Sequence, residues 1–253
     1  NMAETSTVIS HLDDLLQMSK VPDYPGAHNG LQLANDGVIC RVAAAVDACL
    51  PVIQQAVDQE VDLLLVHHGM FWSGVQPIRD AYYQKLKLAM EHNLAIYSAH
   101  IPLDIHESLG NNAQLIQTIG VENSQSFFPW KGVLLGQRAE VDWSRDECVQ
   151  RVQKAIGGSR VHCSAGGPSR VRQIAVITGG AGSEVAAVAA QGIDTFITGE
   201  GPHHTYALAE ELGVNLLYAG HYATETFGVK ALATHMSEKF DVPWDFIDHP
   251  SGL

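Results

Sequence analysis

The stretch VDLLLVHHGMFW, from Val61 to Trp72, decides how the rest of the chain is interpreted. Its apolar residues 63–66 predict a buried strand of a parallel sheet, and this strand leads directly into His67 and His68. In open α/β sheets, ligands bind at the carboxyl ends of the strands, because the loops that leave those ends surround a crevice. The two imidazoles are therefore candidate ligand-binding groups. A pair of loop histidines satisfied by their neighbours is the alternative for this stretch alone.

Length and composition indicate a globular protein. The chain has 253 residues, of which 46% are hydrophobic and 17% are charged, so it can bury a sizeable core. Its formal net charge of −13 repels phosphate backbones, and we expect no nucleic-acid binding through a broad basic surface. No apolar run approaches the ~20 residues that span a bilayer, so no membrane partner is expected. The four cysteines form no C-x-x-C pair and no signal peptide opens the sequence, which predicts a cytoplasmic protein with reduced thiols.

Apolar periodicity predicts strands and helices in alternation. Strands are expected at residues 31–33, 38–46, 61–66, 94–99, 132–141, 161–163, 171–178, 194–198, 215–219 and 244–247. Helices are expected at residues 5–18, 50–59, 77–92, 111–119, 144–156, 183–191, 205–212 and 224–239. This order is typical of the α/β class with mostly parallel or mixed sheets. A Phe/Pro/Trp segment at 127–130 interrupts it, so we expect a first α/β lobe over residues 1–130 and a second over 131–253.

Two parts of the chain resemble each other. RVAAAV at Arg41 aligns with RQIAVI at Arg172, and the step from Val42 to Asp62 is the same 20 residues as the step from Ile174 to Asp194. DLLLVHH then matches DTFITGE, which sets His68 opposite Glu200. Further on, YSAH-x-x-x-D, which ends in Asp104, matches YAGH-x-x-x-E. Such a repeat predicts two related lobes whose strand ends could face one shared cleft.

The predicted strand ends carry imidazoles and carboxylates. These residues are His67, His68, His100, Asp104, Glu200, His221 and Glu225. Imidazole and carboxylate together suit Zn, Mn or Fe, whereas the lack of thiolates argues against an iron–sulfur or structural zinc site. Three histidines and two carboxylates fit a dinuclear site with ions ~3.5–4 Å apart, and the natural chemistry of such a site is hydrolysis. The alternative is a cluster of polar loop residues at a sheet edge.

Two further motifs leave alternatives open. TGGAGS, at residues 178–183, lies between a predicted strand and a predicted helix, so its amides could cradle a phosphate, or it is a tight turn without a ligand. The neighbours Phe71 and Trp72 could stack on a base or sugar, or they pack within their loop.

An ordered set of motifs links the chain to a known family. HNGLQ at 28–32, VHHGMFW, AHIPLD, LGNNAQL, ITGE and AGHYATE occur in this order, and with them nearly the whole chain resembles the NGG-one-interacting factor three-like family. Bacterial members of that family carry the label GTP cyclohydrolase I type 2 homologue. The resemblance implies two intertwined α/β lobes, a metal site in the cleft between them and a homohexameric ring. It also implies the ligands of a dinuclear metal centre, which fall on His67, His68, Asp104, His221 and Glu225.

Three functions follow from these observations, and we favour the first. It is a hydrolase of a small phosphorylated or heterocyclic substrate that uses two divalent ions, Zn, Fe or Mn. The second is a metal carrier or insertion factor, and the third is a regulatory scaffold whose metals stabilise the ring. The repeat places His100 and Glu200 beside the ligands, where proton transfer and orientation of the attacking water are the predicted catalytic roles. The alternative is that both residues orient ligating imidazoles.

Overall fold

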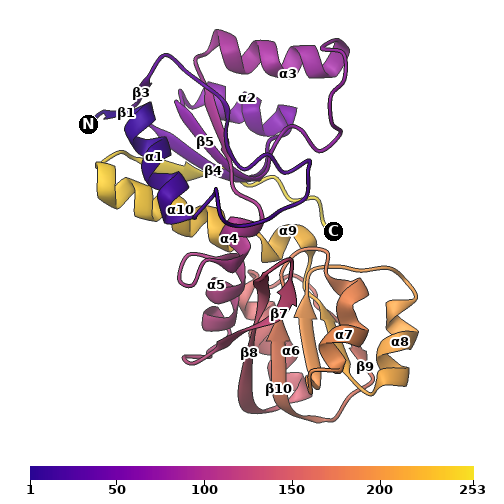
Figure 1. Cartoon of the computed structure of the whole chain (residues 1–253). Coiled ribbons are helices and arrows are strands. Elements are labelled where there is room, and N and C mark those ends of the chain that lie inside the picture. The colour runs from indigo at the N-terminus through magenta and orange to yellow at the C-terminus, as the bar shows by residue number, and fades with distance from the viewer. The chain divides into compact units, whose positions relative to one another are not determined.

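The computed structural model describes residues 1–253 and belongs to the predicted α/β class. The chain divides into two compact units, of which the first contains residues 1–103 and 228–249 and the second contains residues 104–227 and 250–253. Each unit is built on one mixed β-sheet (Figure 1). The predicted lobes were 1–130 and 131–253, whereas here the Phe/Pro/Trp segment belongs to the second unit and residues 228–249 belong to the first. The Phe/Pro/Trp segment forms strand β7 (Gln125–Trp130) of the second sheet.

The sheet of the first unit has the strand order β13-β4-β5-β6-β2. Its strands are β2 (Gly30–Leu33), β4 (Val42–Asp47), β5 (Leu63–His68), β6 (Ala95–Ser98) and β13 (Trp244–Phe246). All neighbours pair in parallel except β2, which is antiparallel to β6. A separate antiparallel ribbon pairs β1 (Ala3–Glu4) with β3 (Val38–Ile39). The apolar run of β5 is buried on both faces, as expected for a central parallel strand.

Helices cover both faces of this first sheet (Figure 1). On one face, α2 (Leu50–Asp58) and α3 (Asp80–Glu91) pack their apolar side chains against those of β4, β5 and β6. On the other face lie α1 (Thr5–Leu15) and α10 (Thr226–Phe240). The Tyr97 hydroxyl of β6 donates a hydrogen bond of 2.9 Å to Asp13 of α1. The carboxyl ends of β5 and β6 are therefore held by a core on each side.

The sheet of the second unit has the strand order β7-β8-β10-β11-β12-β9. Besides β7, its strands are β8 (Val133–Ser144), β9 (His162–Ala165), β10 (Arg170–Val176), β11 (Thr195–Thr198) and β12 (Asn215–Tyr218). Strands β10, β11 and β12 are parallel, and the remaining pairs are antiparallel. The parallel centre again presents several strand ends at one edge of the sheet.

Helices also cover both faces of the second sheet. Apolar side chains of α5 (Asn111–Thr118) and α6 (Arg145–Ala155) pack on one face. Those of α7 (Val185–Ala189) and α8 (Thr205–Leu212) pack on the other. Three short helices complete the structure: α4 (Ile101–Ile105), the 3₁₀ turn η1 (Gly182–Glu184) and α9 (His221–Thr224). Helix α4 contains the boundary between the two units.

The predicted elements are present with shifted ends, and two of them are divided. The range 38–46 becomes β3 and β4, because the amides of Cys40 and Arg41 donate to the Asp62 carboxylate at 2.7 and 2.9 Å instead of continuing a strand. The range 183–191 becomes η1 and α7. No helix of the structure meets the length and hydrophobicity that a membrane span requires.

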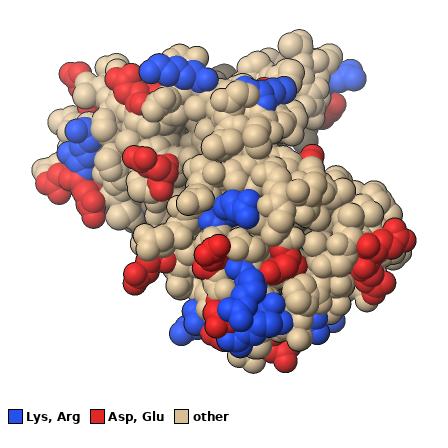
Figure 2. Space-filling view, turned by 60° about the horizontal axis from the view of Figure 1, so that its bottom comes forward, with Lys and Arg blue, Asp and Glu red and all other residues tan.

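Charged side chains of both signs are intermixed on the surface in Figure 2, with Lys and Arg gathered most densely near the bottom of the view. Basic side chains of the second unit pair with nearby carboxylates. Arg170 and Arg172 both contact Asp142, at 2.5 and 2.9 Å. Such pairing offsets the positive charge and agrees with the acidic balance of the whole chain.

Candidate metal centre

Three histidines meet at the strand ends of the first unit. His67 and His68 are the last residues of β5, and His100 follows β6. Ring nitrogens of all three lie within 4.8 Å of one another, and His67 is fully buried. The structure therefore brings together the three imidazoles that the sequence assigned to neighbouring strand ends.

Each of these imidazoles is oriented through its Nδ1 atom. The Nδ1 of His67 lies 2.8 Å from the Ala99 carbonyl oxygen, and the Nδ1 of His68 lies 2.7 Å from the Asp47 carboxylate. The Nδ1 of His100 lies 2.8 Å from the Asp23 carboxylate. Oxygen atoms of carbonyls and carboxylates only accept, so Nδ1 carries the hydrogen in all three rings. A neutral ring in this tautomer offers the lone pair of Nε2, which is the form that binds a metal.

Asp23 anchors the loop that leads to β2. Its side chain is only 6% exposed and accepts hydrogen bonds from His100, from the amide of Tyr24, from the Asn29 side chain and from the amide of Ile101. Burial alone would raise the pKa of Asp23, but its interaction with His100 and its hydrogen bonds from Asn29 and the Ile101 amide outweigh burial and hold the pKa below its ordinary value. The loop is thereby fixed against the end of β6.

The second unit contributes one imidazole and two carboxylates. Asp104 lies on α4, His221 begins α9 and Glu225 directly follows α9. Carboxylate oxygens of Asp104 and Glu225 lie within 4.8 Å of each other, and the Nε2 of His221 is 3.2 Å from Glu225. The Nδ1 of His221 lies 2.6 Å from a Glu200 oxygen, so it carries the hydrogen, as in the first unit.

The TGGAGS segment supports this second group of side chains. The Thr178 hydroxyl donates to Asp104 at 3.3 Å, and the amide of Gly179 donates to the Thr224 hydroxyl at 3.0 Å. Amides of Thr178, Ala181 and Gly182 are also bonded within the protein. Gly179 has φ +78°, and any side chain there would overlap the Glu225 carboxylate. The segment is thus a tight turn beside the carboxylates, and these amides donate hydrogen bonds within the protein instead of to a phosphate.

All seven residues that the sequence singled out lie in one of these two groups, while several of their supports were missed. Asp47 could have been found, because it pairs in register with His68 at the end of a parallel strand. Asn111, which donates to Asp104 at 3.0 Å, stood within the quoted LGNNAQL motif. Asp23 gave no signal, because it lies in a Pro-containing loop far from His100 in sequence.

The donor set of both groups fits a metal. Imidazoles held through Nδ1, together with the half-buried Asp104, the buried Glu225 and no thiolate, suit Zn, Mn or Fe. His/Asp/Glu clusters of this structure could hold metal ions.

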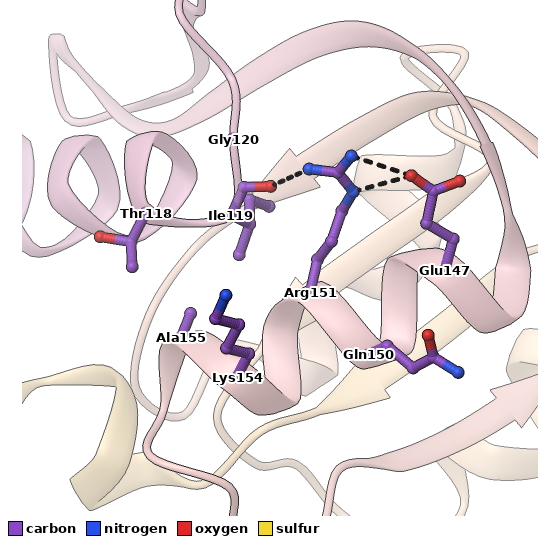
Figure 3. A pocket seen from close by; sticks show the side chains of 8 residues that line it. All are labelled: Thr118, Ile119, Gly120, Glu147, Gln150, Arg151, Lys154 and Ala155. Atoms are coloured by element: carbon purple, nitrogen blue, oxygen red, sulfur yellow. Dashed lines mark hydrogen bonds and ion pairs between the residues drawn. The ribbon is translucent and has the colours of Figure 1, made fainter.

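A separate pocket of about 520 Å³ lies in the second unit between the end of α5 and α6 (Figure 3). Within it, Arg151 donates to Glu147 at 2.8 and 3.0 Å and to the Ile119 carbonyl at 3.0 Å. The Arg151 guanidinium also lies over the Trp143 ring at 4.4 Å. Arg151 therefore ties α6 to the end of α5, and none of the strand-end residues lines this pocket.

Fold and site define a two-sheet α/β protein with a candidate metal centre of histidines and carboxylates at its strand ends. The chain belongs to the Duf34/NIF3 (NGG1p interacting factor 3) family, which residues 3–251 match, and the resemblance inferred from the motifs is confirmed. It is 36% identical over 249 residues to the GTP cyclohydrolase 1 type 2 homolog of Deinococcus radiodurans, covering 97% of this chain and 93% of that protein. A protein of the same name from Pyrococcus horikoshii is 38% identical over 248 residues, covering 97% and 98% of the two chains. The crystal structure of TTHA1606 from Thermus thermophilus matches with a TM-score of 0.88 and 34% identity, over 99% of this chain and 100% of that one.

Proposed function

We propose that this protein is a metal-dependent hydrolase of a small phosphorylated or heterocyclic substrate, with two divalent ions held by His67, His68, Asp104, His221 and Glu225. The observation that carries the proposal is the shared state of the imidazoles. Those of His67, His68 and His221 all direct a hydrogen from Nδ1 to an oxygen, at 2.6 to 2.8 Å, which makes Nε2 the nitrogen that would bind a metal. Five ligands of this type exceed what one tetrahedral ion needs, which supports a dinuclear centre.

The chain's own residues set the ligands in place. Asn111 and Thr178 hydrogen-bond to Asp104, so its carboxylate is held by two donors. Asp47 holds His68, and Glu200 holds His221. Two divalent ions at these ligands would act as Lewis acids and make water a nucleophile near neutral pH. Zn, Fe and Mn all suit the donor set.

His100 and Glu200 take different roles within this proposal. The contact of 2.6 Å between Glu200 and the Nδ1 of His221 supports an orienting role for Glu200 rather than a catalytic one. His100 is held by Asp23, and its ring centroid lies 5.0 Å from that of His67. We assign it proton transfer to the leaving group, a role worth ~10²–10⁴-fold in rate.

Metal analysis and turnover test the proposal together. Elemental analysis of reconstituted protein should show about two divalent ions per chain. Screening phosphoesters, nucleotides including GTP, and amides should find hydrolysis that a chelator abolishes. His68→Ala should lower the metal content, whereas Tyr206→Ala should leave it unchanged, because Tyr206 is exposed on α8 beside His162. A stoichiometry that stays at one ion in both wild type and His68→Ala contradicts the dinuclear centre. Bound metal that is handed to an acceptor protein without any turnover supports the carrier function instead.

We also propose that the protein is a homo-oligomer, a hexamer, on the basis of its family resemblance. Light scattering at micromolar concentration is the test. A mass of 27.3 kDa, that of one chain, across dilutions contradicts this proposal.

A further inference from the structure

The structure separates the roles of the two aromatic residues that follow the histidine pair. Phe71 is half-buried, packs against the core of the first unit and sits edge-on to His28 at 5.4 Å. Trp72 is 40% exposed and lies beside the imidazoles. Its ring centroid is 4.8 Å from that of His100, with an angle of 75° between the planes, and 6.2 Å from that of His68, with an angle of 82°. Of the pair, Trp72 alone borders the candidate metal ligands.

The Trp72 ring is held in place by backbone as well as by imidazoles. A Cβ atom added to Gly26 would lie 3.1 Å from the Trp72 Cα and 3.2 Å from its Cε3, so this glycine packs directly on the tryptophan. The loop that contains Gly26 is in turn fixed by Asp23. Tyr24 of the same loop is 51% exposed and lies 6.3 Å from His100, measured between ring centroids. An exposed aromatic ring is ordinary on a protein surface, but one that is fixed nearly perpendicular to the rings of His68 and His100 is placed for contact with a ligand.

We propose that Trp72 is a stacking platform for a planar heterocyclic ring of the ligand, with Tyr24 at its border. This inference rests on the proposed function, because the stacked ring belongs to a molecule whose remaining polar part reaches the imidazoles. Because 40% of the Trp72 surface is exposed, part of the indole is open to a ligand ring while the imidazoles stay in place. Stacking of a base on an aromatic side chain commonly changes affinity about tenfold to hundredfold and tolerates different bases. The proposed substrate class, small phosphorylated or heterocyclic molecules, is thereby narrowed to molecules that carry a planar heterocycle.

Two probes isolate the contribution of the planar ring. Guanosine 5′-monophosphate and ribose 5-phosphate share the sugar phosphate and differ by the base. Isothermal titration of the metal-reconstituted full chain should give an affinity for the nucleotide about tenfold to hundredfold higher than for the sugar phosphate. Adenosine 5′-monophosphate should behave like the guanosine probe, because stacking does not depend on the hydrogen-bonding edge of the base.

Variants at position 72 test whether Trp72 causes the difference in affinity between the two probes. Trp72→Leu keeps an apolar side chain against Gly26 and should bring the affinity ratio of the two probes close to one, whereas Trp72→Phe should retain most of it. Tyr206→Ala is the matched control, since Tyr206 is also exposed beside a histidine, His162 at 5.9 Å, but on α8 of the second unit. It should leave the ratio unchanged. Metal content and thermal unfolding of each variant verify that the site and fold persist.

Specific outcomes overturn this inference without bearing on the metal centre. Equal affinity for the two probes in the wild type, no binding of either at millimolar concentration, or an unchanged ratio in Trp72→Leu would each remove the platform. Failure of the proposed function looks different. If the protein binds no metal, or if His68→Ala leaves the binding of both probes unaltered, the metal centre is wrong, while the ratio still reports on Trp72.

Discussion

Each of the two units contains three corresponding parallel strands, but different side chains follow the ends of these strands. Strands β4, β5 and β6 of the first unit correspond to β10, β11 and β12 of the second, and each set is followed by a short helix. The correspondence extends to one hydrogen-bonding device. An Asp62 oxygen accepts the amides of Cys40 and Arg41 at 2.7 and 2.9 Å, and an Asp194 oxygen accepts those of Arg172 and Gln173 at 2.9 and 2.8 Å.

The strand ends exchange the roles of ligand and support. Position 68 of the first unit is a histidine held by Asp47 of the neighbouring strand, whereas its counterpart Glu200 holds His221. His100, the counterpart of His221, is held by Asp23 from a loop. The first unit therefore presents three imidazoles and supports two of them with Asp47, at the end of β4, and Asp23, in a loop. The second unit supports its one imidazole with Glu200, which follows β11. Each unit thus carries its own group of imidazoles and carboxylates on the same arrangement of strands.

Positions 67 and 199 correspond in the repeat, and they show why the second unit has no histidine at this place. His67 is a fully buried imidazole, but in the second unit a Cβ at Gly199 would crowd the Gly179 carbonyl, the His221 Cα and the Gly220 carbonyl. The turn that orients His221 and Glu225 occupies the space that an imidazole fills in the first unit.

Gly199→Ala should have the largest effect on stability, a loss of about 3 kcal/mol, because the added methyl group meets rigid backbone atoms. Urea unfolding measures the change. Gly180→Ala in the neighbouring TGGAGS turn is the control, since a Cβ there would be 3.6 Å from His221, an ordinary contact, and should cost little. Equal midpoints for the two variants would show that the second unit does have room at position 199.

Glu200→Gln and Asp47→Asn should each weaken metal binding about 10- to 100-fold, because each removes the charged acceptor that orients a ligating imidazole. Competition with a chelator of known affinity measures the loss. If Glu200→Gln keeps full metal affinity and abolishes turnover instead, Glu200 is catalytic and the exchange of roles described above is incorrect.

Asp62→Ala and Asp194→Ala should lower stability by similar amounts, about 1.5 kcal/mol each, because each leaves two backbone amides without their carboxylate. Chemical unfolding compares them directly. Asp62→Asn, which retains one acceptor oxygen, should cost less. A large difference between the two alanine variants would break the structural equivalence of the units.

The smallest expected effect concerns a contact of the first unit between α1 and α10. The Nε2 atoms of His11 and His235 lie 2.9 Å apart. Burial lowers the pKa of His11, and the positive charges of Lys239 and His235 lower it further, whereas the charge of Asp14 acts in the opposite direction. The unfolded chain, with a histidine pKa near 6.5, then binds this proton more readily than the folded chain. Stability present above about pH 6.5 is therefore lost as the pH falls through 6.5 toward the folded pKa.

His11→Asn should reduce this pH dependence, whereas the exposed His92→Asn should not. Unfolding midpoints at about pH 7.5 and about pH 5.5 provide the comparison. A pH dependence that is the same in His11→Asn and wild type would exclude the pair as its source.

Much of the fold could be predicted because its signals are local. Apolar runs and helical periodicity located nearly every element, and α8 coincides with the predicted range 205–212. The internal repeat of the sequence aligns His68 with Glu200. Strand β7 was missed because Pro129 argues against a strand, although an edge strand such as β7 tolerates proline.

By itself, the sequence determined the α/β class, the internal repeat and the donor residues at the strand ends, since each depends on neighbouring residues and on the side-chain chemistry. Only the tertiary structure decided where the compact units divide, which carboxylate holds which imidazole, and that Trp72 rather than Phe71 borders the histidines. Asp23 and His100 are 77 residues apart, and Gly26 meets Trp72 through backbone packing. Such contacts are formed by chain folding over long sequence separations, and no local pattern encodes them.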